Sequence, residues 1–477
     1  MKDIYNSALY RYLSSSNLNL LMKINQIRKN QTLTFDEIKN LQEKQLKKLL
    51  EYVLTHSIFY KNYYASNGIT LDKVHKVSFE DLPIIDKEII MENYDDVVCD
   101  KNLKRVDLEK FLDDPGNVTK KYKDYYEVIH TSGSSGTLGI FAYNAEEWNV
   151  LRALGIARTS KLKLKPFRKI KFVFVGATDG RYAGISLIRG VPPLFTKLLT
   201  ININSPIDHI VEQVNNYQPD VLSGYASGNF MLAQEQLKGN LNIKPSKIIC
   251  SADLLTDYMR ETIKDAFKIN PINMYAASES IGMASECEAY HNLHLFTDLY
   301  KFEVVDKDLK PVPPGGSGNL ILTNLFNYTE PIIRYKMNDE IIIDDTTCKC
   351  GWPFPILKNI SGRQEDFLWF EKSDGTKEYI HPLTLAVFFV EGLIKFRFIQ
   401  TSTNSLLMKA VVHGNKSSIS SAIYNKINEI LTEKRLNTEV SFELEIVERL
   451  ANDSRTGKFK LIIPFKNLPN TASDEGK

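Results

Sequence analysis

Residues 125–143 read YYEVIHTSGSSGTLGIFAY, and this stretch decides the fold assignment. Its centre, HTSGSSGTLG at residues 130–139, mixes hydroxyl residues with glycines between two strand-like runs. Glycine permits positive φ and close backbone approach, so successive N–H groups and hydroxyls can surround an anion. The stretch therefore predicts a loop for an oxygen-rich anion such as a triphosphate. It lacks the lysine of the G-x-x-x-x-G-K-[ST] loop, and a flexible Ser/Gly linker is the alternative.

Downstream of this loop, strand-like and helix-like segments alternate. Expected strands are KIKFVFVG (169–176), PDVLSGY (219–225), SKIICSA (246–252) and INMYAASES (272–280), and expected helices are PIDHIVEQVNNYQ (206–218), NFMLAQEQLKG (229–239) and LTDYMRETIKDAF (255–267). Such alternation predicts an α/β fold with a parallel sheet and right-handed crossovers. Ligands of these sheets bind at the carboxyl ends of the strands.

The flanking regions follow other patterns. Residues 35–64 show apolar residues at helical spacing and predict one amphipathic helix. After about residue 300, KFEVVDKDLKPVPPGGSGNLILTNL predicts an antiparallel β hairpin. The end of the chain, with FRFIQTS, LLMKAVVHG, SFELEIVE and a helix over 417–435, predicts a small α+β domain. We place the boundary between Gly362 and Arg363, which gives domains 1–362 and 363–477.

Composition excludes several classes of protein. The 477 residues are 43% hydrophobic and 25% charged, and 60 basic against 58 acidic side chains give a net charge of +2. These values are typical of globular proteins and argue against a nucleic-acid or membrane-surface binder. No run is long and apolar enough for a membrane helix, and the N-terminus lacks a secretory signal pattern. We expect a cytoplasmic protein.

Further motifs follow the glycine loop in order. They are YAASE (275–279), GGSGNLILTNL (315–325), PIIRYKMND (331–339), SGRQED (361–366) and RTGKFK (455–460). Together with TSGSSGT (131–137), they resemble the ordered motifs of the adenylate-forming superfamily of acyl-CoA and aryl-CoA ligases. NLFNYTEPIIRY, CKCGWPFP and the helix that ends in FYKNYY resemble the phenylacetate–CoA ligase branch with its CapK-like relatives. The resemblance implies a large ATP- and acid-binding domain with a β subdomain, followed by a small mobile lid.

The resemblance also implies roles for single residues. It assigns nucleotide contacts to Thr131, Ser132, Gly133, Ser134, Ser135, Gly136, Thr137, Ser251, Ala252, Asp253, Tyr275, Ala276, Ala277, Ser278, Asp339 and Arg363. Asp339 would accept the vicinal hydroxyls of ribose, which a carboxylate binds in a bidentate way. The family's glycines before Asp339 and after Tyr275 are Asn338 and Ala276 here. Arg334 is expected to brace a turn rather than touch the ligand.

The catalytic step would depend on two charged side chains. Glu279 would hold Mg²⁺ beside the phosphates, a role that suits a carboxylate. Lys458 would reach the site from the lid and stabilise negative charge that builds at the carboxylate and the α-phosphate. Glu365 and Asp366 match the family's hinge, with Glu in place of one Asp.

A second cluster predicts a metal site. Cys287, His294, Cys348 and Cys350 offer three thiols and an imidazole, the ligand set of structural zinc. The pairing resembles a metal-binding arrangement in part of the same family, whose spacing favours His294 over His291. Separate buried cysteines and a surface histidine are the alternative.

The activity that this resemblance implies has two steps. ATP and a carboxylic acid would give an acyl-adenylate and pyrophosphate, and coenzyme A would then give a thioester and AMP. The acid is aromatic only by family analogy; Phe174, Tyr182, Tyr225 and Phe230 could form its pocket or simply pack the core. An amine, a sugar or a carrier protein as acceptor, and a non-catalytic nucleotide-binding homologue, are the alternatives. A homodimer is left open.

Overall fold

The computed structural model describes most of the chain, namely residues 16–131, 138–159, 168–178, 180–203, 205, 207–344, 346–363, 368–375, 377–380, 385, 388, 390–451 and 460–465. The chain forms two compact units. The larger comprises Met1–Met337 with Ile341–Asn359, and the smaller Asn338–Glu340 with Ile360–Lys477. Over the described ranges, no helix combines the length and the apolar character that a membrane crossing requires.

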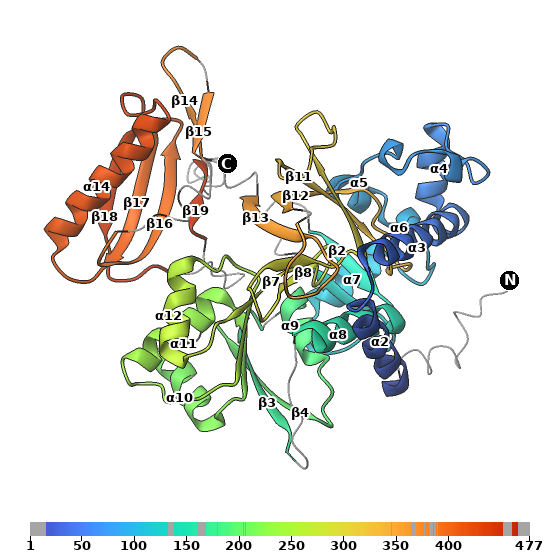
Figure 1. Cartoon of the computed structure of the whole chain (residues 1–477), viewed down its shortest axis with the longest axis horizontal. Coiled ribbons are helices and arrows are strands. Elements are labelled where there is room, and N and C mark those ends of the chain that lie inside the picture. The colour runs from blue at the N-terminus through green and yellow to red at the C-terminus, as the bar shows by residue number, and fades with distance from the viewer. Residues whose placement is uncertain are drawn as a thin grey trace, which may run out of the picture. The chain divides into compact units, whose positions relative to one another are not determined.

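Parallel strands form one half of the main sheet (Figure 1). Their order is β7-β6-β5-β3-β4, with β3 (Ile170–Gly176), β4 (Thr196–Asn202), β5 (Val221–Tyr225), β6 (Lys247–Ser251) and β7 (Ile272–Tyr275). The connecting helices are α9 (Ala183–Arg189), α10 (Ile207–Tyr217), α11 (Ala226–Leu237) and α12 (Asp257–Phe267). Strands and helices share one apolar core, in which Val173, Leu222 and Ile248 are fully buried. Because the strands are parallel, their carboxyl ends meet at one edge, as the sequence predicts.

Antiparallel strands extend this sheet on the side of β7. They are β8 (Ala284–Glu286), β9 (Leu293–Leu295), β10 (Tyr300–Val305), β11 (Ser317–Asn324), β12 (Tyr335–Asp344) and β13 (Ile356–Arg363), and the full order is β10-β11-β12-β13-β9-β8-β7-β6-β5-β3-β4. The predicted hairpin is confirmed, because β10 and β11 pair antiparallel. A separate hairpin joins β1 (Glu127–His130) to β2 (Ile140–Tyr143) on either side of the glycine loop.

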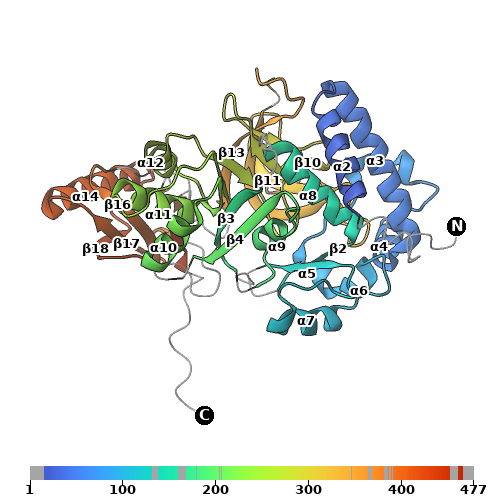
Figure 2. The same ribbon diagram turned by 90° about the horizontal axis from the view of Figure 1, so that it is seen from below.

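Helices precede the sheet in the chain. They are α2 (Asn17–Asn30), α3 (Phe35–His56), α4 (Ile58–Ser66), α5 (Lys87–Glu92), α6 (Tyr94–Val97) and α7 (Arg105–Asp113), with short 3₁₀ turns η2 (Val74–Lys76), η3 (Phe79–Asp81) and η4 (Pro115–Asn117). Helix α2 packs along α8 (Ala145–Thr159), which follows β2 (Figure 2).

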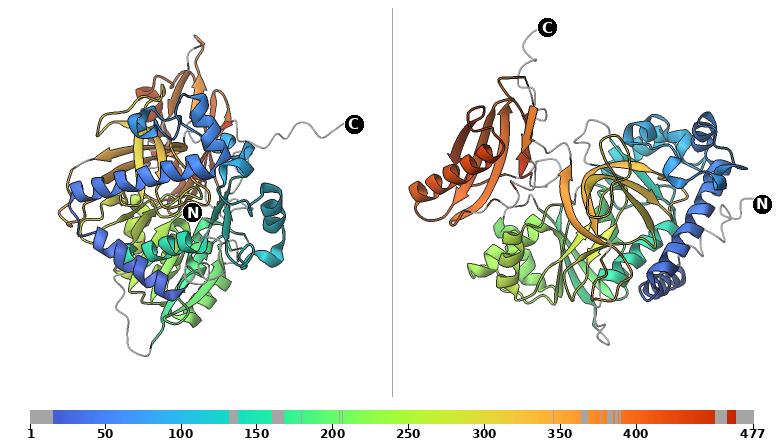
Figure 3. Two further views of the ribbon diagram at one scale, coloured as in Figure 1. Left: turned by 90° about the vertical axis from the view of Figure 1, so that its right-hand side faces the viewer. Right: turned by 45° about the horizontal axis from the view of Figure 1, so that its top comes forward.

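The prediction of one helix over residues 35–64 is wrong. The long helix α3 ends before Ser57, which is extended, and α4 begins after it (Figure 3). The Ser57 hydroxyl accepts the N–H of Tyr60 at 3.3 Å and donates to the carbonyl oxygen of Asp96 at 2.9 Å. Serine is a strong helix N-cap, and this cap satisfies an N–H of α4 that a continuous helix would bond differently.

The smaller unit has its own sheet and core. Its strands β16 (Leu393–Ser402), β17 (Ser405–Val412), β18 (Ser441–Ile446) and β19 (Ile462–Ile463) lie in the order β18-β17-β16-β19, and a second hairpin pairs β14 (Leu368–Glu371) with β15 (Lys377–Ile380). Helix α14 (Lys416–Glu433) covers one face, where Ile423 and Ile427 are buried with Phe398 and Met408. The mixed α/β fold class is therefore as predicted. The predicted boundary falls at the end of β13, and the division into 1–362 and 363–477 stays a prediction.

Candidate nucleotide site and candidate metal centre

The glycine loop is closed at its base by two hydrogen bonds. The N–H of Thr131 donates to the carbonyl oxygen of Gly139, and the N–H of Gly139 donates to the Thr131 hydroxyl, each at 2.9 Å. One step outward, His130 lies opposite Ile140 in the β1–β2 register. A Cβ added at Gly139 would lie 3.0 Å from the Thr131 methyl group and 3.1 Å from the Phe141 ring, so a side chain there would require these neighbours to shift. Thr131 is the described member of the predicted loop, and Ser132, Gly133, Ser134, Ser135, Gly136 and Thr137 lie outside the described residues.

The YAASE motif lies beside this neck. Residues Ala277–Ser280 form a tight turn in which each end donates its N–H to the carbonyl oxygen of the other at 3.3 Å. The Ser278 hydroxyl reaches the carbonyl oxygen of His130 at 3.5 Å. Burial, together with charges that include Glu279, raises the pKa of Tyr143 on β2 well above its ordinary value. The contact of Ser278 with His130 places the turn that carries Glu279 at the end of β1, beside the base of the glycine loop.

A strained turn ends strand β6 at the predicted adenine-side residues. Ala252 has φ of +71°, and the N–H of Asp253 bonds the carbonyl oxygen of Ser251 at 2.9 Å. This is a γ-turn with positive φ, a rare conformation for a residue with a side chain. The Asp253 carboxylate accepts the N–H groups of Ala226 at 2.5 Å and Ser227 at 3.3 Å, at the start of α11. Asp253 thus caps a helix that follows the neighbouring strand β5.

The predicted contacts of the smaller unit are described in part. Asp339 lies in β12, and Arg363 is the last residue of β13. Glu365, Asp366 and Lys458 lie outside the described residues. In the larger unit, Tyr275 is the last residue of β7 and Ala276 follows it. Both lie next to the end of the neighbouring strand β6, which carries Ser251. The roles of these residues stay predictions.

The aromatic residues expected near the acid divide into two groups. Phe174, Tyr225 and Phe230 are at most 4% exposed and belong to the core of the parallel sheet. Tyr182 is partly buried, and its ring lies 4.8 Å from the ring of His130. Core packing explains the first three, whereas Tyr182 lies beside the strand that leads into the glycine loop.

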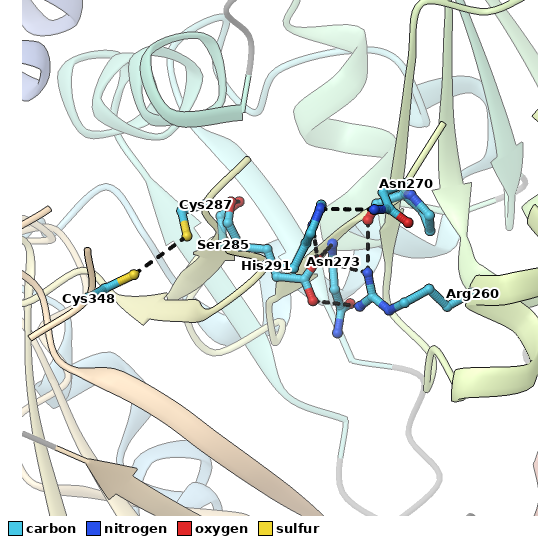
Figure 4. Close-up of polar contacts among 9 residues, drawn as sticks. Arg260, Asn270, Asn273, Ser285, Cys287, His291 and Cys348 are labelled. Atoms are coloured by element: carbon cyan, nitrogen blue, oxygen red, sulfur yellow. Dashed lines mark hydrogen bonds and ion pairs between the residues drawn. The ribbon is translucent and has the colours of Figure 1, made fainter. Parts of the chain in front are cut away.

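The four predicted metal ligands come together. One ligand atom from each of Cys287, His294, Cys348 and Cys350 lies within 4.8 Å of all the others. The sulfurs of Cys287 and Cys348 are 3.9 Å apart (Figure 4), and Cys350 Sγ is 3.4 Å from Nε2 of His294. Three thiols and an imidazole at this spacing fit a closed tetrahedral zinc site without an open position for water. The alternative of separate cysteines does not describe this geometry.

Groups around these four residues suit metal ligation. The His294 Nδ1 lies 3.0 Å from the carbonyl oxygen of Phe354, which leaves Nε2 directed at the sulfur of Cys350 and available as a ligand. Burial lowers the pKa of His294, so the neutral imidazole is favoured. The Asn292 amide and the N–H of Trp352 donate to the sulfurs of Cys348 and Cys350 at 3.3 and 3.4 Å. Such N–H···S bonds stabilise thiolates.

His291 turns away from this cluster, as the spacing predicts. Its Nε2 contacts the Asn270 amide at 3.2 Å, and its Nδ1 is 3.7 Å from Glu286 (Figure 4). Glu286 in turn pairs with Arg260 at 2.5 Å and accepts the N–H of Asn273 at 3.0 Å. His291 therefore belongs to a polar network on the other side of Cys287.

One buried ion pair escaped sequence reasoning. Arg158, near the end of α8, and Asp298 are both without exposed side-chain surface and lie 2.5 Å apart. Asn30 of α2 donates to the same Asp298 oxygen at 2.7 Å. The guanidinium lies 4.2 Å from the ring of Phe296 and 4.4 Å from that of Phe354. The sequence signal that could have found the pair is a single charged residue within a mostly apolar run, Arg158 in LGIARTS and Asp298 in HLFTDLY.

A buried carboxylate organises the NLFNYTEPIIRY segment. Glu147 of α8 accepts the N–H groups of Tyr328 and Thr329 at 2.9 Å and of Asn144 at 2.8 Å. Burial raises the pKa of Glu147 to about 7, and these hydrogen bonds act in the opposite direction. Glu330 accepts the N–H of Ala142 on β2 at 2.7 Å. The segment is therefore tied to the strand that follows the glycine loop.

Arg334 has the bracing role that the sequence predicts. Its guanidinium pairs with Glu303 at 2.9 Å and donates to the carbonyl oxygens of Glu80 and Leu82. Its N–H donates to the Thr323 hydroxyl at 2.9 Å, and its φ is +48°. These contacts fix the turn before β12.

Comparisons with known proteins give relatives of one kind. The chain is 23% identical to Protein CapK of Staphylococcus aureus over 422 residues, which are 87% of each chain. It is 24% identical to the phenylacetate–coenzyme A ligase of Thermus thermophilus over 347 residues, 71% of this chain and 73% of the relative. A solved structure of 2-hydroxyisobutyryl-CoA ligase with 2-HIB-AMP matches with a TM-score of 0.69 at 20% identity, over 92% of this chain and 93% of the other. No family model matches the sequence.

The fold is that of the solved CoA ligase, and the sequence is similar over most of its length to CapK and to phenylacetate–CoA ligases. The predicted fold class is confirmed. The predicted resemblance to CapK and the phenylacetate–CoA ligases is confirmed too, and these relatives support the predicted class of enzyme, an AMP-forming acid–CoA ligase.

Proposed function

We propose that the protein activates a carboxylic acid with ATP and transfers the acyl group to coenzyme A. In the first step the acid's carboxylate oxygen attacks the α-phosphorus, which forms an acyl-adenylate and releases pyrophosphate. In the second step the thiol of coenzyme A attacks the acyl carbon, and AMP leaves. The observation that carries this proposal is the contact of Ser278 with His130, which brings the YAASE turn to the base of the glycine loop.

The roles of the residues follow from charge and position. The loop 131–137 would bind phosphate oxygens through N–H groups and hydroxyls, and Asp339 would accept the ribose hydroxyls. Glu279, on a turn beside that loop, would hold Mg²⁺, which supplies positive charge to the phosphates when bound. Lys458 would stabilise the charge of the adenylation step, and Arg363 would contact the nucleotide. The mixed anhydride carries the activation, so the site needs no protein nucleophile.

We also propose that Cys287, His294, Cys348 and Cys350 bind a structural zinc ion. Four converging ligands, an imidazole oriented by a carbonyl oxygen and N–H donors to two sulfurs support it. Because the ligand set is closed, the zinc would hold β9 to the segment before β13 and would take no part in the reaction.

The acid and the acceptor are separate questions. An aromatic, phenylacetate-like acid is supported by the names of several relatives. An amine, a sugar or a carrier protein stays an alternative acceptor, because the name of the CapK relative, matched over 87% of both chains, specifies no acceptor. A non-catalytic nucleotide-binding homologue is the alternative from another class, and Ala276 and Asn338 are the departures from the family pattern that favour it.

An ATP–pyrophosphate exchange screen tests the proposal. Purified protein is given ATP, Mg²⁺ and single acids from aryl, alkyl and amino-acid panels, and AMP release is then compared with and without coenzyme A. Lys458→Ala should lower exchange by about 10²–10³-fold, the usual cost of one preorganised charge contact. Lys460→Ala, two residues along the same segment, is the matched control and should leave exchange near the wild-type rate. No exchange with any acid would favour the non-catalytic homologue.

A further inference from the structure

Arg181 is a buried arginine beside the base of the glycine loop. It lies in the segment between β3 and α9, is 3% exposed, and its guanidinium lies 5.2 Å from the ring of Phe111. The guanidinium donates to the carbonyl oxygens of Val128 (2.6 Å), Asn117 (3.0 Å), Val118 (3.2 Å) and Lys120 (2.5 Å) and to Oε2 of Glu127 (2.9 Å).

The backbone of Arg181 extends this contact to His130. The N–H of His130 donates to the carbonyl oxygen of Arg181 at 3.1 Å, and the N–H of Arg181 approaches His130 Nε2 at 3.3 Å. The other ring nitrogen of His130 lies 2.8 Å from the carbonyl oxygen of Thr131. One ring therefore links Arg181 to the first residue of the loop. The arrangement requires Nε2 to accept, so Nδ1 carries the proton.

These contacts hold β1 on the side opposite β2. Arg181 bonds β1 at Glu127, Val128 and His130, while its Nη1 group binds the turn after η4. A planar guanidinium can meet acceptors in several directions at once, whereas an ammonium on a flexible stem cannot reproduce that geometry. Burial lowers the pKa of Arg181, and the charge of Glu127 opposes this. The ion pair thus keeps a buried cation compensated.

We infer that Arg181 is a positioning residue for nucleotide binding, because it fixes the strand end from which the glycine loop starts. The inference rests on the proposed function for the identity of the ligand. Arg181 touches no nucleotide in this scheme; it acts through His130 and Thr131. Its loss should displace His130 and Thr131, and a displacement of about 1 Å in positioned groups can cost about 10²-fold.

Binding of MgATP to the full-length protein tests this inference by isothermal titration. Arg181→Gln and Arg181→Lys should raise the Kd for MgATP between about tenfold and a hundredfold, and lysine should give no rescue. Glu127→Gln keeps an oxygen that can accept from Arg181 but removes the compensating charge, so it should raise the Kd for MgATP less than the Arg181 variants do. Arg152→Gln is the matched control, because Arg152 is a partly buried arginine whose charge also acts on Glu127, but whose hydrogen bonds go to Gly190 and Asn149 and not to β1. It should leave the Kd within about twofold of the wild-type value.

A second readout separates positioning from general stability. Hydrogen exchange of the amides of residues 128–131 and 139 should accelerate in the Arg181 variants and not in Arg152→Gln, even where both lose similar thermal stability. In turnover, the KM for ATP should rise while the KM for the acid stays constant. Arg181 variants that bind MgATP as tightly as wild type, or an equal loss in Arg152→Gln, would overturn the inference. Wild-type protein that binds MgATP but catalyses no exchange would defeat the proposed ligase and leave the inference standing; wild type that binds no MgATP would defeat both.

Discussion

The carbonyl oxygen of Phe354 lies 3.0 Å from Nδ1 of His294, while the Phe354 ring covers the buried guanidinium of Arg158 at 4.4 Å. One residue therefore joins the candidate metal centre to the buried ion pair. Trp352 extends the link, because its ring lies 5.3 Å from His294 and 6.4 Å from Phe296, the other aromatic residue on Arg158. Loss of the metal should therefore loosen more than its own ligands.

The metal centre gives a first prediction. Wild-type protein should contain about one zinc per chain by elemental analysis, and Cys348→Ser should lose it. The variant should also lose more than about 3 kcal/mol of unfolding free energy, because metal loss is among the large single-site effects. Cys99→Ser, a cysteine away from the cluster, should keep both zinc and stability. Full zinc content in Cys348→Ser would contradict the assignment.

The buried ion pair gives a second prediction. Arg158→Met leaves the Asp298 carboxylate buried beside Asn30 without its cation, and should cost about 3–5 kcal/mol in urea unfolding. The double variant Arg158→Met with Asp298→Leu should be more stable than either single variant, because it leaves no uncompensated charge. If the loss of unfolding free energy in the double variant equals the sum of the losses in the two single variants, the two side chains are not coupled.

Glu147 gives a prediction on pH. Its pKa is raised from an ordinary 4.5 to about 7 by burial, so between these values the folded protein holds a proton that the unfolded chain has lost. The contribution of Glu147 to stability is therefore full below about pH 4.5 and falls as pH rises to about 7, by roughly 3 kcal/mol at most. The measurement is the difference in unfolding free energy between wild type and Glu147→Gln across pH 5–8. A difference that does not change with pH would refute this.

Two glycines give a matched pair of substitutions. Gly224 in β5 has φ of +138°, and a Cβ there would lie 2.1 Å from the carbonyl oxygen of Val175 on β3. Gly224→Ala should therefore cost more than about 3 kcal/mol or prevent folding, because backbone must move. Gly239 has φ of +81° and no heavy atom within 4 Å of an added Cβ. Gly239→Ala should cost about 1 kcal/mol from backbone strain alone. Equal losses of unfolding free energy for Gly224→Ala and Gly239→Ala in chemical denaturation would show that the backbone moves easily enough to relieve the clash with Val175.

The spacing of apolar residues predicted helices and strands well where a segment carries one clear pattern, either a buried run or an amphipathic repeat. Residues 169–280 alternate as expected because each buried strand and each amphipathic helix carries its own apolar pattern. Strand β4 (Thr196–Asn202) was missed, since TKLLTIN lies on the edge of the sheet and is mostly half buried, so it lacks a run of fully buried apolar residues. The break at Ser57 was missed because its cause is tertiary: the Ser57 hydroxyl bonds Asp96, which is far along the chain.

The candidate site was predictable where short motifs carry chemistry. The four candidate metal ligands converge as predicted, and sequence could pick them out because thiols and imidazole are rare and specific ligands. The structural contacts of Arg181 and Asp253 could not be predicted from sequence, because their partners are backbone carbonyl or N–H groups of segments far along the chain. Backbone partners of this kind leave no pattern in residue identity.

The hydrogen bonds of the amino-terminal helices have a consequence for biosynthesis. Asn30 bonds Asp298, Gln42 bonds the carbonyl oxygens of Thr297 and Tyr300, and the Tyr60 hydroxyl bonds that of Pro331. On a translating ribosome, helices α2–α4 emerge well over two hundred residues before these acceptors exist. They must wait, exposed, until the antiparallel half of the sheet has been made, so nascent chains halted before residue 297 should be the ones that recruit chaperones.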